Sequence, residues 1–131
     1  MRAYIRAMRV LQQVIVLDAA DMDAEAAFWA ALLDGIVEPD ENWRSIIVDG
    51  RWHMGIQYAP NHVTPEWPHG EQQQQIHLDL YVDDLRRAHQ RVVELGARLL
   101  QPANNPDADE GFQVYADPAG HPFCLCWTKS P

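Results

Sequence analysis

Cysteine is scarce in this chain, with only Cys124 and Cys126 among 131 residues. One residue separates them, so they share a face of the strand predicted there and are poorly placed to bond to each other. This excludes the disulfide framework of a small secreted domain. We therefore expect a reducing compartment and a cytoplasmic location.

Positive charge is also in short supply. Lys and Arg number 10 against 19 Asp and Glu, which gives a formal net charge of −9. Nucleic-acid binding needs a Lys/Arg footprint for the phosphates, so we expect no nucleic-acid partner. No apolar run approaches the ~18 residues of a membrane-spanning helix, so we expect no membrane partner either.

Several catalytic and binding motifs are missing. The sequence has no glycine-rich phosphate loop, no GxSxG motif and no zinc-type CxxC pair. These absences exclude a P-loop nucleotide site, the nucleophile turn of α/β-hydrolases and a zinc finger. Any function must therefore come from residues that the fold brings together.

The first half of the chain shows the pattern of one strand, one helix and three strands. β-Branched and aliphatic residues predict a strand over 10–17, and apolar residues at spacings of three and four predict a helix over 22–33. We expect Asp21 to cap this helix and Gly35 to end it in a left-handed conformation. Three further strands are predicted at 36–38, where Pro39 interrupts the pattern, and at 43–48 and 51–58, joined by an Asp49-Gly50 hairpin.

The second half repeats this order after a loop over 59–74 that contains three prolines. Aligned without gaps, Val14 falls on His77 and Asp21 on Asp84, which should cap the second helix until Gly96 ends it. We therefore predict an α+β fold with an internal repeat: module one at about 10–58, the connecting loop at 59–74, and module two at about 75–128. Residues 1–131 then form a single domain.

The segments "AAFWAALLDG", "HLDLYVDDLRRAHQRVVELGA" and "YADPAGHPFCLC" resemble the glyoxalase/bleomycin resistance/dioxygenase superfamily, also called vicinal oxygen chelate proteins. The likeness is greatest to its glyoxalase-like domains. It implies two tandem βαβββ modules forming a cup-shaped, curved mixed sheet with the helices outside. It also implies a cup that is often completed by a homodimer.

The same resemblance tests for a metal, since metal-dependent members bind a divalent ion through the first and last strands of each module. The matching positions here are Val14, Gln57, His77 and Cys124. Valine cannot bind a metal, glutamine is a weak ligand, and catalytic sites normally use about three good protein ligands. We therefore expect no cofactor and no catalytic metal; if a divalent metal does bind, His77 and Gln57 would be its ligands.

Polar residues on the predicted inner faces are candidate anchors for a ligand. His77 and Asp79 alternate with Ile76, Leu78 and Leu80, so both point to one face, about 6–7 Å apart along the strand. His53 and Gln57 share the polar face of the strand at 51–58. We predict His77, Asp79, Gln57 and His53 as ligand anchors, with Tyr81 and Cys124 on the wall.

Three functions remain compatible with these residues. The preferred one is a glyoxalase-like protein that binds a small organic molecule in the cup between the modules without a catalytic metal. The first alternative is an enzyme of the same superfamily: a metal-dependent lyase or isomerase, or a dioxygenase. The second alternative is an interaction module whose cup is filled by its own side chains.

Overall fold

The structure is a computed structural model that describes residues 8–129. Its elements follow the predicted order, with a strand, a helix and three strands in each half. The bounds in module one are β1 (Ile15–Ala19), α1 (Met22–Leu32), β2 (Ile36–Asp40), β3 (Trp43–Val48) and β4 (Arg51–Tyr58). Those in module two are β5 (Leu78–Tyr81), α2 (Leu85–Glu94), β6 (Arg98–Gln101), β7 (Gly111–Ala116) and β8 (Pro122–Trp127).

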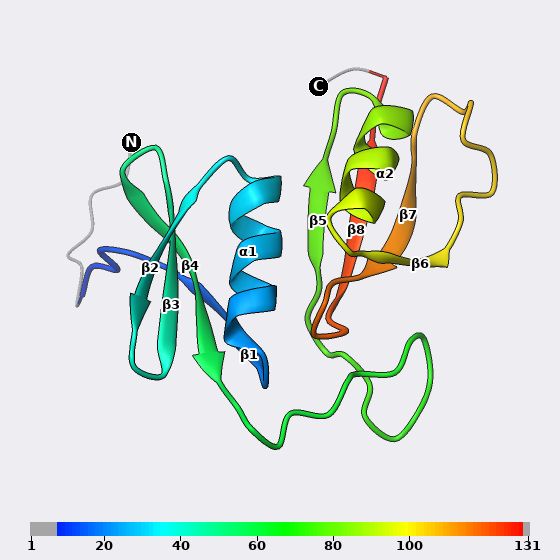
Figure 1. Ribbon diagram of the computed structural model, residues 1–131. Coiled ribbons are helices and arrows are strands. Elements are labelled where there is room, and N and C mark those ends of the chain that lie inside the picture. The colour runs from blue at the N-terminus through cyan, green and yellow to red at the C-terminus, as the bar shows by residue number, and fades with distance from the viewer. Residues whose placement is uncertain (1–7, 130–131) are drawn as a thin grey trace.

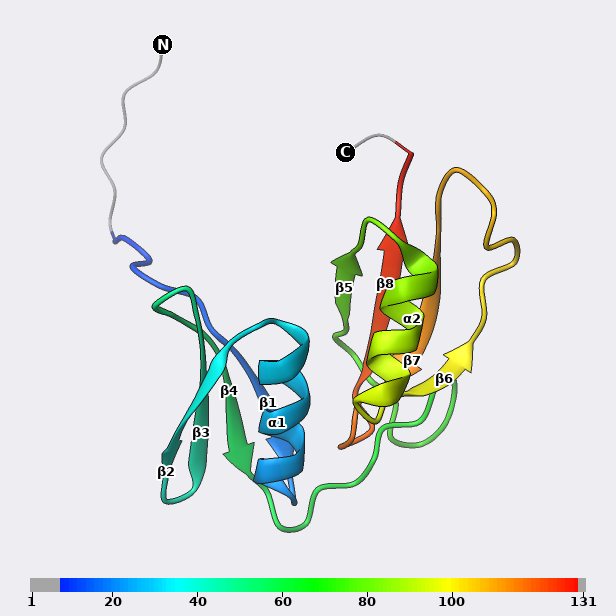
Figure 2. The same ribbon diagram turned by 45° about the horizontal axis from the view of Figure 1, so that its top comes forward.

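The strands form two four-stranded mixed sheets, in the orders β1-β4-β3-β2 and β5-β8-β7-β6. In each sheet the first strand of the module pairs in parallel with the last, and the other pairs are antiparallel. Figures 1 and 2 show the two modules beside each other, joined by the long connecting loop. The predicted α+β class and the repeat of two βαβββ modules are thus confirmed.

Turn and cap chemistry explains most element ends. The Asp21 carboxylate accepts from Ala24 N at 3.0 Å, and Asp84 caps α2 in the same way. Asp49 and Gly50 have φ values of 51° and 75°, as a two-residue hairpin with a left-handed backbone requires. Gly96, with φ of 114°, follows the end of α2 as predicted.

Three predictions about module one are wrong in detail. β1 begins at Ile15 and runs to Ala19, because these residues pair with β4 from Met54 to Tyr58. The left-handed residue after α1 is Asp34, with φ of 56°, not Gly35. A Cβ on Gly35 would instead meet Ile47 O at 2.7 Å, so close strand approach explains the glycine.

The third error concerns Pro39, which was expected to interrupt the short strand at 36–38. β2 continues through Pro39, which lies opposite Arg44 in the ladder with β3. β2 is an edge strand of its sheet, and an edge strand tolerates proline because one side of it needs no hydrogen bonds.

Helix α1 joins the two modules, and Figure 1 shows it between the two sheets. Its Trp29 ring lies 5.3 Å from the ring of Phe123 in β8, measured between centroids, and Trp29 Nε1 donates to Asp117 Oδ2 at 3.0 Å. The Glu25 carboxylate accepts from Ala119 N at 3.0 Å. Aromatic packing and buried hydrogen bonds therefore hold module one to the turn between β7 and β8.

Within residues 8–129, no helix has the length and apolar character needed to cross a membrane.

Candidate functional site

Alternation along β5 separates core residues from site residues. Leu78 and Leu80 pack into the main core, whereas His77, Asp79 and Tyr81 line a cavity on the opposite face. This is the period of two that any strand imposes on its side chains. The sheet of module two therefore has a core-facing side and a cavity-facing side.

Strand β8 shows the same division and lies beside β5. Phe123 and Leu125 belong to the main core, and Cys124 and Cys126 belong to a second cluster with Val114 on the cavity side. In the parallel ladder Asp79 is the partner of Cys124. Backbone pairing thus sets the carboxylate and the thiol next to each other.

The cavity on this face has a volume of about 610 Å³ and opens to solvent. That volume lies within the range of sites for small organic molecules. Its wall combines aromatic rings with polar side chains, among them the neighbouring pair His77 and Asp79. The lining residues are Trp67, His77, Asp79, Tyr81, Gln101, Glu110, Gly111, Phe112, Cys124, Cys126, Trp127 and Thr128.

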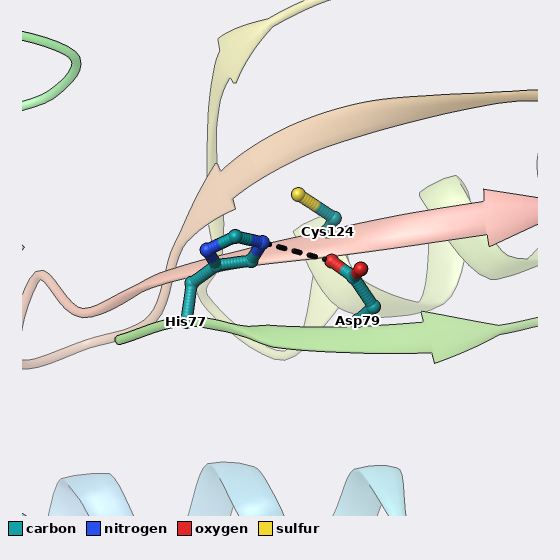
Figure 3. A group of neighbouring side chains, drawn as sticks. All are labelled: His77, Asp79 and Cys124. Carbon is teal, nitrogen blue, oxygen red and sulfur yellow. Dashed lines mark ion pairs between the residues drawn. The ribbon is translucent and has the colours of Figure 1, made fainter. Parts of the chain in front are cut away.

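Three of these side chains form a compact polar cluster. His77 Nε2 and Asp79 Oδ1 are 3.1 Å apart, and the ligand atoms of His77, Asp79 and Cys124 all lie within 4.8 Å of one another. Figure 3 shows His77 just before β5, Asp79 on β5 and Cys124 on β8, with their side chains near one another. The imidazole and the carboxylate are nearly half exposed, whereas Cys124 is buried. The cluster therefore extends from the solvent-exposed side of the cavity to its buried wall.

Burial strongly perturbs both thiols. Burial, and after it the negative charge of Asp79, raise the pKa of Cys124 to about 12 and that of Cys126 to about 11. In the metal-free protein both groups are therefore neutral thiols at physiological pH. They serve as small apolar wall residues with weak S–H donors.

A second cavity, of about 480 Å³, lies between the two modules along the edges of β1 and β5. Val14 and His77, which align in the sequence repeat, both line it. His62 and His121 line it too; their rings are 5.0 Å apart, and each bonds a backbone carbonyl through Nε2. His77 therefore contributes to both cavities.

The structure brings four of the six predicted anchor and wall residues together. His77, Asp79, Tyr81 and Cys124 line the 610 Å³ cavity. His53 and Gln57 lie on β4 in module one, exposed, and are absent from this cavity and from the His77 cluster. The set that gathers around His77 thus comes from β5, β8 and the end of the connecting loop.

Sequence patterns gave a partial view of the aromatic wall. Trp67, in the connecting loop, packs on the cavity-side cluster, and its ring lies 6.1 Å from that of His77. Phe112 was not singled out. Its position two residues before Val114, on a strand beside β8, was the available signal. Trp127 packs over Gly111, where a Cβ would be 2.7 Å from the indole.

One protein-family model and many solved structures match this chain. The model of a family described as "Glyoxalase-like domain" matches residues 14–126. No curated protein matches the chain. Many solved structures have a similar fold.

Three of these structures illustrate the range. A glyoxalase-related enzyme from Fulvimarina pelagi is 21% identical, with 90% of this chain and 89% of that one covered and a TM-score of 0.63. A glyoxalase/bleomycin resistance protein/dioxygenase family enzyme from Burkholderia phytofirmans is 15% identical, with coverages of 88% and 96% and a TM-score of 0.66. The fosfomycin resistance protein FosX from Listeria monocytogenes, in complex with Mn(II) and sulfate, is 15% identical, with 92% of each chain covered and a TM-score of 0.64. At these identities the likeness establishes the fold alone.

Proposed function

Because the chain belongs to the glyoxalase-like domain family, within the glyoxalase/bleomycin resistance/dioxygenase superfamily, we propose that it binds a small organic molecule in the cavity of module two. The observation that carries this proposal is the open 610 Å³ cavity, which combines aromatic walls with the His77 and Asp79 pair. The filled-cup alternative required side chains to occupy this face, and a cavity lies there instead.

The His77 and Asp79 pair supports a specific orientation of the ligand. His77 can donate or accept through its ring, and the Asp79 carboxylate accepts only, so together they suit a hydroxyl, an amine or an amide group. The aromatic rings of Trp67, Phe112 and Trp127 would contact the apolar part. A ligand with a polar head and an apolar or aromatic body fits this division.

The ligand atoms of the cluster determine which metals could bind there. FosX from Listeria holds Mn(II), an ion that favours oxygen ligands in octahedral geometry. Here the clustered atoms are one imidazole nitrogen, one carboxylate and one thiol, and the aligned position in module one is Val14. This set does not fit Mn(II), so we propose that the side chains bind the organic molecule without a catalytic ion of that kind.

The second candidate is an enzyme of the superfamily, a metal-dependent lyase or isomerase, or a dioxygenase. The observation that favours it is the His77, Asp79 and Cys124 cluster itself, because it offers three ligand atoms. Gln57, which the sequence suggested as the companion ligand of His77, is not part of that cluster.

We also propose that the protein is a cytoplasmic homodimer, as the two free thiols and the open site suggest. The module-one positions His53, Gln57 and Val16 are exposed within one chain. In the dimer they would face the module-two cavity of the partner and complete it.

Light scattering tests the dimer and should give twice the 15.0 kDa chain mass. Val16→Asp should give monomers, whereas Val63→Asp in the connecting loop should not; a monomeric parent protein would contradict the dimer.

The binding proposal is tested with a small-molecule screen on reduced, chelator-treated protein, read by thermal shift and then by calorimetry. For a hit, His77→Ala should weaken binding about tenfold or more, as expected from losing one polar anchor worth about 1.4 kcal/mol. His69→Ala, at an exposed loop histidine outside the cavity, is the matched control. Unchanged affinity in His77→Ala would show that the anchor assignment is wrong.

A further inference from the structure

The cavity of module two has two carboxylates in its wall and no strongly basic side chain. Asp79 and Glu110 line it, and within residues 8–129 no Lys or Arg does. The His77 imidazole in the same wall is charged only when it is protonated. An anionic ligand would therefore meet two negative groups without a compensating cation, whereas both groups would attract a cationic ligand.

Glu110 differs from its acidic neighbours in the loop before β7. In that loop Asp107 forms an ion pair with Arg86, with 2.8 Å between nitrogen and oxygen. Asp109 forms another with Lys129 at 3.6 Å. None of the ion pairs in the part of the chain that the structure describes involves Glu110. The loop carboxylate that lines the cavity is thus the one that receives no cation from the chain.

Strand register places two aromatic rings between these carboxylates. Cys126 on β8 pairs with Tyr81 of β5 on one side and with Phe112 of β7 on the other. Neighbouring strands lie about 4.8 Å apart, so the backbones of Tyr81 and Phe112 are about 10 Å apart with the thiol between them. Both rings line the cavity, and each is at least half exposed.

The two carboxylates lie at opposite ends of this ring pair. Asp79 precedes Tyr81 by two residues on β5, and Glu110 precedes Phe112 by two residues. Because β5 is parallel to β8 and β7 is antiparallel to it, these two offsets run in opposite directions. The sheet therefore presents an aromatic middle with a negative group toward each end.

We propose that the module-two cavity binds an organic cation, an alkyl- or arylammonium compound whose nitrogen lies beside the rings of Tyr81 and Phe112. The faces of aromatic rings attract cations, and this attraction adds to that of the two carboxylates. The proposal rests on the binding site of the proposed function and specifies the class of its ligand. After burial, the charge of Asp79 is the next cause that raises the pKa of Cys124 and Cys126, so its field reaches across β8.

Three probes that share a phenylethyl body test the charge of the ligand: 2-phenylethylammonium, 2-phenylethanol and 3-phenylpropanoate. Each is titrated by calorimetry, near neutral pH and at low salt, into the full reduced chain after chelator treatment. We expect the ammonium to bind at least about tenfold more tightly than the alcohol, and the carboxylate to bind most weakly. Raising the salt from about 0.01 M to about 0.15 M should weaken binding of the ammonium and leave that of the alcohol unchanged.

Substitutions assign the ammonium preference to particular residues. Asp79→Asn and Glu110→Gln should each lower the ratio of ammonium to alcohol affinity about threefold or more. Phe112→Leu keeps an apolar side chain but removes the ring, so it should lower this ratio about twofold or more. Asp107→Asn is the matched control, because it removes a negative charge from the same loop outside the cavity lining, and it should leave the ratio unchanged. Circular dichroism verifies the folding of each variant.

Two results would overturn the inference. One is an ammonium that binds no more tightly than the alcohol, and the other is a ratio that Asp107→Asn lowers as much as Asp79→Asn and Glu110→Gln do. If the ammonium fails while the small-molecule screen yields a neutral or anionic ligand that depends on His77, the binding proposal stands and only the cation class is wrong. If neither the screen nor any of the three probes shows binding, the proposed function fails together with the inference.

Discussion

The buried carboxyl of Glu25 should make the protein less stable as the pH rises. Glu25 is fully buried in the first turn of α1, where its Oε1 accepts from Ala119 N. Burial, then a hydrogen bond and charge repulsion from Asp117, raise the pKa of Glu25 from 4.5 to about 10. Asp117 is held in place by Trp29 Nε1 and by two backbone N–H groups, so it cannot move away easily.

The sign and size of the effect follow from proton linkage. Between pH 4.5 and about 10 the folded chain holds a proton on Glu25 that the unfolded chain has released. The stabilisation from this neutral carboxyl is complete below pH 4.5 and is lost progressively as the pH rises toward 10. One proton changes the free energy of unfolding by about 1.4 kcal/mol per pH unit, or roughly 3 kcal/mol between pH 6 and pH 8.

Glu25→Gln isolates this contribution, because the amide keeps the shape of the neutral acid and cannot ionise. Its oxygen can still accept from Ala119 N, and its N–H can donate to Asp117. Relative to the parent protein, we expect the variant to gain stability with pH, by roughly 3 kcal/mol between pH 6 and pH 8. Near pH 5 the two proteins should be close in stability.

Urea unfolding followed by tryptophan fluorescence measures this difference, since Trp29 is buried beside Asp117. Glu41→Gln, at an exposed position, is the control and should show no pH-dependent difference from the parent. A constant difference between parent and Glu25→Gln from pH 5 to pH 8.5 would refute the reasoning. So would a variant whose deficit grows with pH.

Three further predictions rest on local packing and chemistry. Gly55→Ala should cost about 1–3 kcal/mol in urea unfolding, because its Cβ would lie 2.1 Å from Trp43, and an unchanged midpoint would contradict this packing. Asp84→Ala should lower the free energy of unfolding by about 1 kcal/mol, because the α2 cap is lost. If alanine at a position that caps no helix lowered it more, the capping role would be wrong. Cys124 and Cys126, with pKa values raised to about 12 and about 11, should react with a disulfide reagent at pH 8 at least about 100-fold more slowly than a free thiol. Rapid labelling of the folded protein would contradict their burial.

Local signals predicted most of the fold. The helix caps at Asp21 and Asp84, the hairpin at Asp49-Gly50 and the repeated order of elements were all readable because each depends on a few adjacent residues. The predictions were wrong where residues distant in the sequence determine the local structure. β1 begins where β4 can pair with it, and Gly35 is explained by the approach of a backbone oxygen from β3.

The same distinction applies to the site. Alternation on one strand was enough to place His77, Asp79 and Tyr81 on a common face. Proximity across strands was not, because it depends on register: the alignment of Asp79 with Cys124 is a property of the β5–β8 ladder. Trp67 reaches the cavity from the connecting loop, whose path has no periodic signal in the sequence.

The two-sided character of β5 and β8 has a consequence for how such a protein can diversify. Residues that form the cavity alternate with residues that form the core, so a mutation of one set leaves the other set unchanged. The contacts between the modules use α1, the turn after β7 and the core-facing Phe123 of β8, not the cavity-facing side chains. Selection can therefore exchange the side chains at 77, 79 and 124 with little effect on folding, and one scaffold can acquire new ligand chemistry by substitution at a few positions of two neighbouring strands.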